Sequence, residues 1–214
     1  VFERIDEPIN DDMTFPMFVK PSHEGTGMGV SSKSIVRNEE ELREQVSFVM
    51  GKYKQTALVE KFIEGREVTL GLVGNLLGPA ARRLPDDESA PRIWEGLEFL
   101  PPMEVDLKPF VDSDIVYGNR LKVELADQLT YLCPAPLPQE FIDDLEWYTA
   151  AVFRVTGGRD VSRVDFRLDI NDNWKPYILE INPLPGLSPG VSDLVIEAAA
   201  KGIDHAQLVN MILD

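Results

Sequence analysis

The feature of the sequence that most constrains its fold is a pair of segments in which polar and apolar residues alternate. Residues 163–166 read Arg-Val-Asp-Phe and residues 180–182 read Glu-Ile-Asn, the period of two that is typical of a strand with one buried face. The Asn-Asp-Asn run at 171–173 suits a turn between them. We therefore predict a hairpin with strands over residues 161–170 and 177–182.

Pairing of these strands gathers polar side chains on one face of the hairpin. Residues two apart on a strand share a face, so Glu180 lies beside Asn182, and the pairing can bring Asp165 and Arg163 next to them. Two carboxylates and an amide oxygen suit Mg²⁺, which takes its remaining ligands from water and phosphate. The alternative is a pair of solvated carboxylates on an ordinary hairpin.

A second candidate site is the glycine-rich segment at residues 25–29, Gly-Thr-Gly-Met-Gly, which follows an apolar run ending at Lys20 and Pro21. Glycine lets the main chain approach a ligand closely, so the loop N–H groups and the Lys20 ammonium could surround a polyphosphate. The segment matches neither the P-loop nor the dinucleotide-binding pattern. A plain tight hairpin is the alternative.

The remaining elements follow from periodicity and from turn residues. A helix begins after its cap Asn38 and ends near Gly51, Asp193 caps a helix over 194–201, and Asp204 caps a last helix that runs to residue 212. Six prolines between residues 78 and 119 predict a loop or lid. Further strands are expected over residues 15–21, 30–36, 57–63 and 67–73, and a further helix over 139–155.

Composition excludes several classes of partner. The 214 residues include 37 acidic and 21 basic ones, and the formal net charge of -16 repels nucleic acid and anionic membranes. The single cysteine, Cys133, cannot form an intrachain disulfide, and no apolar run reaches the roughly 18 residues of a membrane span. We expect a soluble, cytoplasmic protein with no nucleic-acid or membrane partner. The polar start at Val1, without a signal-peptide pattern, favours a fragment of a longer chain.

Together these segments resemble the D-alanine-D-alanine ligase family of ATP-grasp enzymes over about residues 15–214. The matching blocks, in order, are residues 18–21, 24–29, 59–67, 133–135, 163–166 and 180–186. The resemblance implies an α+β ATP-grasp fold in which two α+β subdomains with antiparallel sheets sandwich the nucleotide. Residues 1–64 would form the first subdomain and residues 65–214 the second.

For ATP, the resemblance implies a site shared between strands and the glycine loop. Lys20 is similar to the family's phosphate-contacting lysine, and Glu67 to the acceptor of the ribose hydroxyl. A solvated strand edge is the alternative for Glu60 and Glu67. The loop glycines that would cover the β and γ phosphates are Gly25, Gly27 and Gly29, and the adenine hinge would be Glu60, Lys61, Phe62 and Ile63.

For the chemistry, Asp165, Glu180 and Asn182 match the family's Mg²⁺ ligands, with Mn²⁺ as an alternative metal. Arg163 resembles the arginine that steadies the oxyanion. Lys122 resembles a second phosphate lysine, and Thr26 would supply the loop hydroxyl.

The activity that the resemblance implies is ATP-dependent joining of a carboxylate to an amine through an acyl phosphate, as in peptidoglycan precursor synthesis. Amino acids would be the substrates, an N-terminal domain would complete the protein and support a homodimer, and residues 1–214 alone would be inactive. Val191 stands where the family's carboxylate-binding serine is expected. The alternatives are a nucleotide-binding module and a ligase of other amino or hydroxy acids with a role outside the cell wall.

Overall fold

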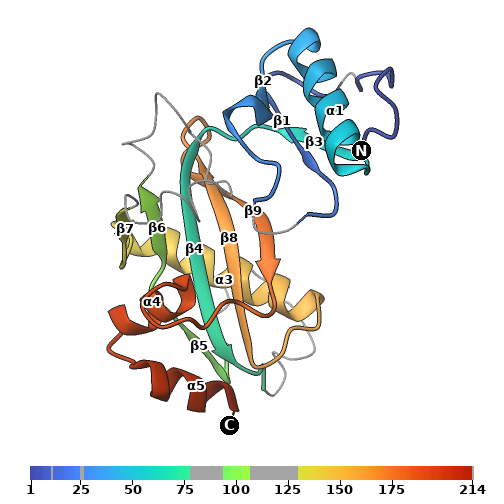
Figure 1. Ribbon diagram of the computed structural model, residues 1–214. Helices are drawn as coiled ribbons and strands as arrows, with labels where there is room; N and C mark the ends of the chain where they lie inside the picture. Colours follow the sequence, from blue (N-terminus) through green and yellow to red (C-terminus); the bar gives the residue numbers. More distant parts are fainter. Residues whose placement is uncertain (11, 25–26, 78–93, 107–129, 214) are drawn as a thin grey trace. The chain divides into compact units, whose positions relative to one another are not determined.

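The computed structural model describes residues 1–10, 12–24, 27–77, 94–106 and 130–213. The described chain forms two compact units, one containing residues 1–63 and the other residues 64–105 and 131–213. Helices and antiparallel sheets are present in both units (Figure 1), which confirms the predicted α+β class. Among the described residues, no helix combines the length and the apolar character needed to cross a bilayer.

The first unit is a three-stranded sheet covered by one helix. β1 (Met17–Pro21) lies between β2 (Ile35–Val36) and β3 (Ala57–Lys61) and is antiparallel to both. Alternate residues of β1 are buried, because they pack against the apolar stripe of α1 (Glu39–Tyr53). This core consists of Phe2, Met17, Val19, Val36, Leu42, Val46, Val49, Ala57 and Val59.

Helix α1 begins as predicted and ends later than predicted. The Asn38 side chain accepts a hydrogen bond from the Glu41 N–H (2.9 Å), and three glutamates occupy the first turn. The predicted end at Gly51 is wrong, since the helix continues to Tyr53 and Lys54 takes the left-handed conformation that closes it. The strand predicted over 30–36 is reduced to its last two residues, because the 3-10 helix η1 (Ser32–Ser34) precedes it.

The second unit is built on a six-stranded sheet in which β4 and β8 are the central strands. The strand order is β7-β6-β4-β8-β9, and β5 pairs with the end of β4. The strands are β4 (Gly65–Gly74), β5 (Leu97–Phe99), β6 (Met103–Asp106), β7 (Thr130–Leu132), β8 (Val161–Asp169) and β9 (Lys175–Asn182). Because β5 and β6 lie between residues 78 and 119, the prediction of a continuous loop there is wrong for residues 97–99 and 103–106.

The two faces of this sheet have different roles. One face packs against α3 (Gln139–Val155) through the buried side chains Val68, Leu70, Val164 and Phe166. Near Val73 and Val161 the opposite face is apolar, and α4 (Asp193–Ala200) and α5 (His205–Leu213) cover it (Figure 1). Further along that face, paired positions of β4 and β8 carry the polar residues Glu67, Thr69, Arg163, Asp165 and Arg167.

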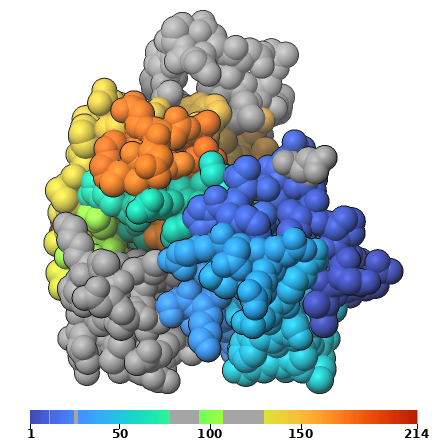
Figure 2. Space-filling view, turned by 90° about the horizontal axis from the view of Figure 1, so that it is seen from above, coloured from blue at the N-terminus to red at the C-terminus, as the bar shows by residue number. Residues whose placement is uncertain are grey.

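The predicted β8–β9 hairpin is confirmed, with turn residues between the two strands. Figure 2 shows this hairpin, in orange, at the surface of its unit. The cap of α5 is also confirmed, because the Gln207 N–H donates to Asp204 Oδ1 (2.8 Å). The predicted cap of α4 is wrong: Ser192 is the N-cap and Asp193 is the first helical residue.

Candidate active site

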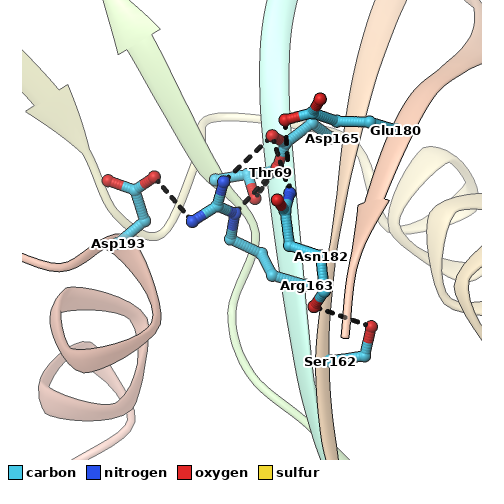
Figure 3. Close-up of polar contacts among 7 residues, drawn as sticks. All are labelled: Thr69, Ser162, Arg163, Asp165, Glu180, Asn182 and Asp193. Atoms are coloured by element: carbon cyan, nitrogen blue, oxygen red, sulfur yellow. Dashed lines mark hydrogen bonds and ion pairs between the residues drawn. The ribbon is translucent and has the colours of Figure 1, made fainter. Parts of the chain in front are cut away.

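Three neighbouring strands place polar side chains in register on the face that α3 does not cover. On β8, Asp165 lies opposite Thr69 of β4 and Glu180 of β9. Two residues away, Arg163 lies opposite Gly71 and Asn182. A register shift after Asp165 pairs Phe166 with Ile178, so that Leu179 has no partner in the ladder. The predicted convergence of Arg163, Asp165, Glu180 and Asn182 is therefore present (Figure 3).

The Asp165 carboxylate is the centre of the array formed by Arg163, Asp165, Glu180 and Asn182, and Asp165 as a residue is 8% exposed. Oδ1 accepts hydrogen bonds from Arg163 Nε (2.8 Å) and Thr69 Oγ1 (2.9 Å). Oδ2 accepts from Arg163 Nη2 (3.0 Å) and Asn182 Nδ2 (3.2 Å). Four donors therefore hold one buried carboxylate, and the carboxylate has no freedom to rotate without breaking charge-assisted bonds.

Arg163 has a second anionic partner at the start of α4. Its Nη1 lies 3.1 Å from Asp193 Oδ2, so the guanidinium stands between two carboxylates, as Figure 3 shows. Burial alone would lower the pKa of Arg163, but hydrogen bonding to Asp165 and the charges of Asp165, Asp193 and Glu197 raise it above its ordinary value. The guanidinium is therefore a fixed positive charge in a nearly buried position.

Asn182 joins the two carboxylates expected to bind metal. Its Nδ2 donates to Asp165 Oδ2 and lies 3.4 Å from Glu180 Oε1. Rotation of this amide by 180° exchanges nitrogen for oxygen and would turn three oxygens toward one point. Among the described residues, no three His, Cys, Asp or Glu side chains cluster in a way that could hold a metal ion. A cation here would bind to two carboxylates and an amide, with its other ligands supplied from outside the protein.

Glu67 lies further along the same face. It sits opposite Arg167, and the Glu67 Oε2 atom is 3.3 Å from Arg167 Nη1 in an ion pair whose side chains are 14% and 7% exposed. This environment differs from the solvated strand edge that was the alternative for Glu67.

In the first unit, the residues predicted to contact ATP occupy β1 and β3. Lys20 Nζ lies 2.7 Å from Glu60 Oε2, so the predicted phosphate lysine and the first hinge residue form an ion pair. The rings of Phe18 and Phe62 stack with their centroids 6.3 Å apart. Lys61 ends β3, and Ile63 follows it by two residues. Lys20, Glu60 and Phe18 thus share one face of the sheet, whereas Lys61 pairs with Met17 and belongs to the opposite face.

The glycine loop returns to the end of β1. Gly27 and Gly29 have φ values of 68° and 82°, and a Cβ on Gly29 would lie 2.6 Å from Pro21 Cγ. Only glycine combines this backbone conformation with so close an approach. Three further predicted site residues, Gly25, Thr26 and Lys122, lie outside the described residues.

Three residues near the array were missed at the level of sequence. Thr69 could have been found from the period of two along 67–73, which puts it on the face of Glu67. Asp193 and Glu197 are one turn apart on α4, a spacing that places them on one side of the helix. The second of these is fully buried, and neither of its carboxyl oxygens has a hydrogen-bond partner among the described residues.

Cys133 is half-buried near this region. Burial and the nearby charge of Glu197 raise the pKa of the Cys133 thiol to about 12. The thiol therefore stays protonated near neutral pH, which is unfavourable for a nucleophile.

Comparison with known proteins gives a consistent result along the chain. The family model for the "D-ala D-ala ligase C-terminus" matches residues 3–84 and 101–214. An uncharacterised protein, y4sG of Sinorhizobium fredii, is 33% identical over 204 residues, which are 95% of this chain and 53% of that protein. The D-alanine–D-alanine ligase of Geobacter sulfurreducens is 32% identical over 209 residues, 97% of this chain and 55% of the ligase.

Solved structures agree on the fold. D-alanine–D-alanine ligase from Bacillus anthracis superposes with a TM-score of 0.66 at 22% identity, covering 97% of this chain and 57% of the ligase. The same enzyme complexed with ATP gives a TM-score of 0.63 at 21% identity, covering 97% and 56%. The chain spans about half the length of the curated relatives that it matches.

Proposed function

The chain belongs to the family of D-alanine–D-alanine ligase C-terminal domains, with the ATP-grasp fold, and we propose that the complete protein is an ATP-dependent carboxylate–amine ligase. It would form an amide through an acyl phosphate, with amino acids as substrates and cell-wall precursor synthesis as its role. Residues 1–64 and 65–214 would be the two ATP-grasp subdomains.

The observation that carries this proposal is the array on β4, β8 and β9. Chemistry at a triphosphate needs anchored oxygen ligands for a cation and a fixed positive charge beside them. Asp165, Glu180 and Asn182 supply the oxygens, and Arg163 supplies the charge, all from paired strands of one sheet. Rigid strands suit this task because the reacting groups must be held within a fraction of an ångström.

Nucleotide binding would also use the first unit. The Lys20 ammonium and the backbone of the glycine loop would contact phosphates, while Glu60, Lys61, Phe62 and Ile63 would hold adenine and Glu67 would accept from the ribose. The solved ligase from Bacillus anthracis that resembles this chain was complexed with ATP, which supports the proposal. Binding would require Lys20 to exchange its bond to Glu60 for a phosphate oxygen.

The donor set also fits the metal that the family implies. Asp165, Glu180 and, after rotation of its amide, Asn182 offer hard oxygen ligands that suit Mg²⁺ and admit Mn²⁺. When bound, the cation would neutralise charge on the phosphate oxygens.

In the reaction, a substrate carboxylate attacks the γ-phosphorus, which gives the acyl phosphate and ADP. The amine of a second substrate then attacks the acyl carbon, and the tetrahedral intermediate expels phosphate while the attacking nitrogen releases a proton to solvent, which leaves the amide. Arg163 carries five N–H donors, and the contacts above direct three of its nitrogens to carboxylates. Each of the two terminal nitrogens has a second N–H group, and these donors would contact the developing oxyanion.

The decisive experiment is an ADP-release assay on the full-length protein. D-alanine, L-amino acids and hydroxy acids are supplied singly and in pairs with MgATP, and the product is identified by mass spectrometry. We expect ADP release with a dipeptide-like product from D-alanine. ADP release that needs no second substrate and gives no amide would contradict the ligase assignment.

One observation favours a different second substrate within the same reaction class. Val191, which stands where a carboxylate-binding serine is expected, is 70% exposed and apolar. The Ser192 hydroxyl already accepts the Ser188 N–H (3.0 Å). If Ser192 compensates, Ser192→Ala will raise the KM of the second substrate and Val191→Ser will lower it. No effect of either change would indicate an acceptor without a carboxylate here.

A further inference from the structure

The first two turns of α4 bring two acidic residues to the side of Arg163 that Asp165 does not occupy. Asp193 reaches the guanidinium at Nη1, whereas Asp165 takes Nε and Nη2. The side chains of Arg163 and Asp193 are 12% and 14% exposed, so solvent screens this ion pair little. Two carboxylates on different elements therefore fix both the position and the plane of one guanidinium.

This arrangement differs from a simple helix cap. Ser192, whose own hydroxyl is engaged by Ser188, is the N-cap, and Asp193 directs its carboxylate out of the helix toward β8. An acidic residue in the first turn is favourable for the helix dipole wherever it points. Asp193 points toward Arg163, as a residue that holds the guanidinium in place would.

Glu197 lies one turn further along α4, against the strand that pairs with Arg163. Its Oε2 is 2.4 Å from the place where a Cβ on Gly71 would be, and Gly71 sits directly opposite Arg163 in the sheet. The side chain is fully buried, with no side-chain hydrogen-bond partner among the described residues, and the Gly71 backbone lies beside it. Burial of this kind disfavours the ionised carboxylate and favours its protonated form.

We propose that Asp193 is a positioning residue that holds Arg163 in place for the ligase reaction, while uncharged Glu197 fills the space behind it without competing for the guanidinium. The proposal rests on the proposed function. Its physical basis is that Asp165 is also a candidate metal ligand, and a carboxylate that turns toward a cation gives up part of its hold on Arg163. The ion pair to Asp193 would keep the guanidinium in place at that moment.

The burial of Glu197 favours the uncharged form of its carboxyl group. Burial raises the pKa of Glu197 well above its ordinary value, the Arg163 charge opposes that rise, and the charges of Asp193 and Asp165 add to it. Glu197 also acts on Arg163 and on Cys133, and the thiol is itself uncharged near neutral pH. On α4, the ion pair with Arg163 is therefore formed by Asp193.

The test begins with a measurement that does not depend on catalysis. In full-length protein with ¹⁵N-labelled arginine, the Nε–H signal of Arg163 is assigned by its loss in Arg163→Lys, and its exchange with water is measured. We expect Asp193→Asn to accelerate this exchange about tenfold or more, because the charge-assisted contact at Nη1 that fixes the plane of the guanidinium is lost. The matched control is Asp204→Asn, which neutralises an acid at the start of α5 and keeps the capping oxygen. It should leave the signal unchanged.

Kinetics with D-alanine and MgATP then separate positioning from simple stabilisation. Asp193→Asn should lower kcat with little change in the KM for ATP, and Asp193→Glu should recover part of the loss. Glu197→Gln should leave the Arg163 signal unchanged, since it replaces an uncharged group of the same shape.

The outcomes are distinguishable from a failure of the proposed function. If the wild type shows no turnover with any substrate, the exchange measurement still decides whether Asp193 holds Arg163. Unchanged exchange in Asp193→Asn would overturn the proposal, and so would a loss of thermal stability with kcat intact. Accelerated exchange in Glu197→Gln would show that Glu197 is ionised and shares the guanidinium.

Discussion

The contact between Gly71 and α4 gives a stringent test of how the array is built. In Gly71→Ala the new Cβ would lie 2.4 Å from Glu197 Oε2, 2.4 Å from Leu194 Cδ1 and 3.2 Å from Leu100 Cδ1. Non-bonded carbon atoms pack at about 3.5–4.0 Å, so the first two contacts are each too short by about 1 Å. Leu194 and Glu197 are fully buried and cannot swing into solvent. Overpacking of this kind typically costs about 1–3 kcal/mol, and two obstructing groups place the expected loss near the upper end.

Chemical denaturation followed by tryptophan fluorescence measures this loss of stability in the second unit, which contains Gly71. The three tryptophans, Trp94, Trp147 and Trp174, all belong to the second unit, as Gly71 does. The midpoint should fall while the m-value stays constant. The matched control is Gly51→Ala in α1, where a Cβ would meet no atom within 4 Å. Followed by circular dichroism, it should stabilise the protein by about 0.5–1 kcal/mol, because alanine is the better helix former.

A double-mutant cycle identifies the obstructing group. In a Glu197→Ala background one of the two closest atoms is gone, so Gly71→Ala should cost less than in the wild type, with a coupling of about 1 kcal/mol or more. An equal cost in both backgrounds would show that Glu197 does not pack on Gly71. The absence of any cost would refute the close approach of α4 to this strand.

Three further predictions address charge, metal and hydrogen bonding. The raised pKa of Glu197 means that the folded state retains a proton that the unfolded state releases, so its contribution to stability is full at low pH and is lost as pH rises toward the folded pKa. The stability of Glu197→Gln should therefore increase relative to that of the wild type as the pH rises above the ordinary range of a carboxyl group in urea titrations, and parallel curves would contradict this sign. Glu180→Gln in the full-length protein should abolish phosphoryl transfer and leave fluorescent-nucleotide affinity largely intact; lost affinity with surviving turnover would mean that Glu180 is no metal ligand. Thr69→Val removes the hydroxyl that donates to Asp165 and should cost about 1–3 kcal/mol in denaturant unfolding. Thr149→Val, which removes a buried hydroxyl without a partner among the described residues, should cost much less, and equal costs would argue against the bond to Asp165.

The sequence allowed the array to be predicted within the hairpin and no further. Alternation with a period of two fixes which side chains of a strand share a face, and a short turn makes two successive strands neighbours. Asp165 and Glu180 were therefore expected together, and the register confirms that they lie opposite each other. A local pattern does not reveal which distant strand lies on the other side of β8, so Thr69 and Gly71 of β4 were not anticipated as part of the array.

The role of Asp193 could not be predicted for a related reason. An acidic residue at the start of a helix is adequately explained by capping, and Asp193 was predicted as the cap, a position that Ser192 occupies in the structure. Tertiary packing decides between them, because α4 is held over Val73 and Val161 by its apolar side and this placement carries Asp193 to Arg163. Strands β5 and β6 were missed similarly, since pairing with β4 stabilises short segments that proline-rich surroundings disfavour.

The formal charges of the array connect its architecture to the proposed use of ATP. Asp165, Glu180 and Asp193 are three carboxylates against one guanidinium, which leaves an excess of two negative charges when Glu197 is protonated. An anionic triphosphate would be repelled by that excess, the more so in a chain with a net charge of -16. One divalent cation compensates it, and the hard oxygens on Asp165 and Glu180 are suited to hold such an ion. The same count explains why a protonated Glu197 matters, because a fourth carboxylate charge in this cluster would exceed what one divalent cation and Arg163 can balance.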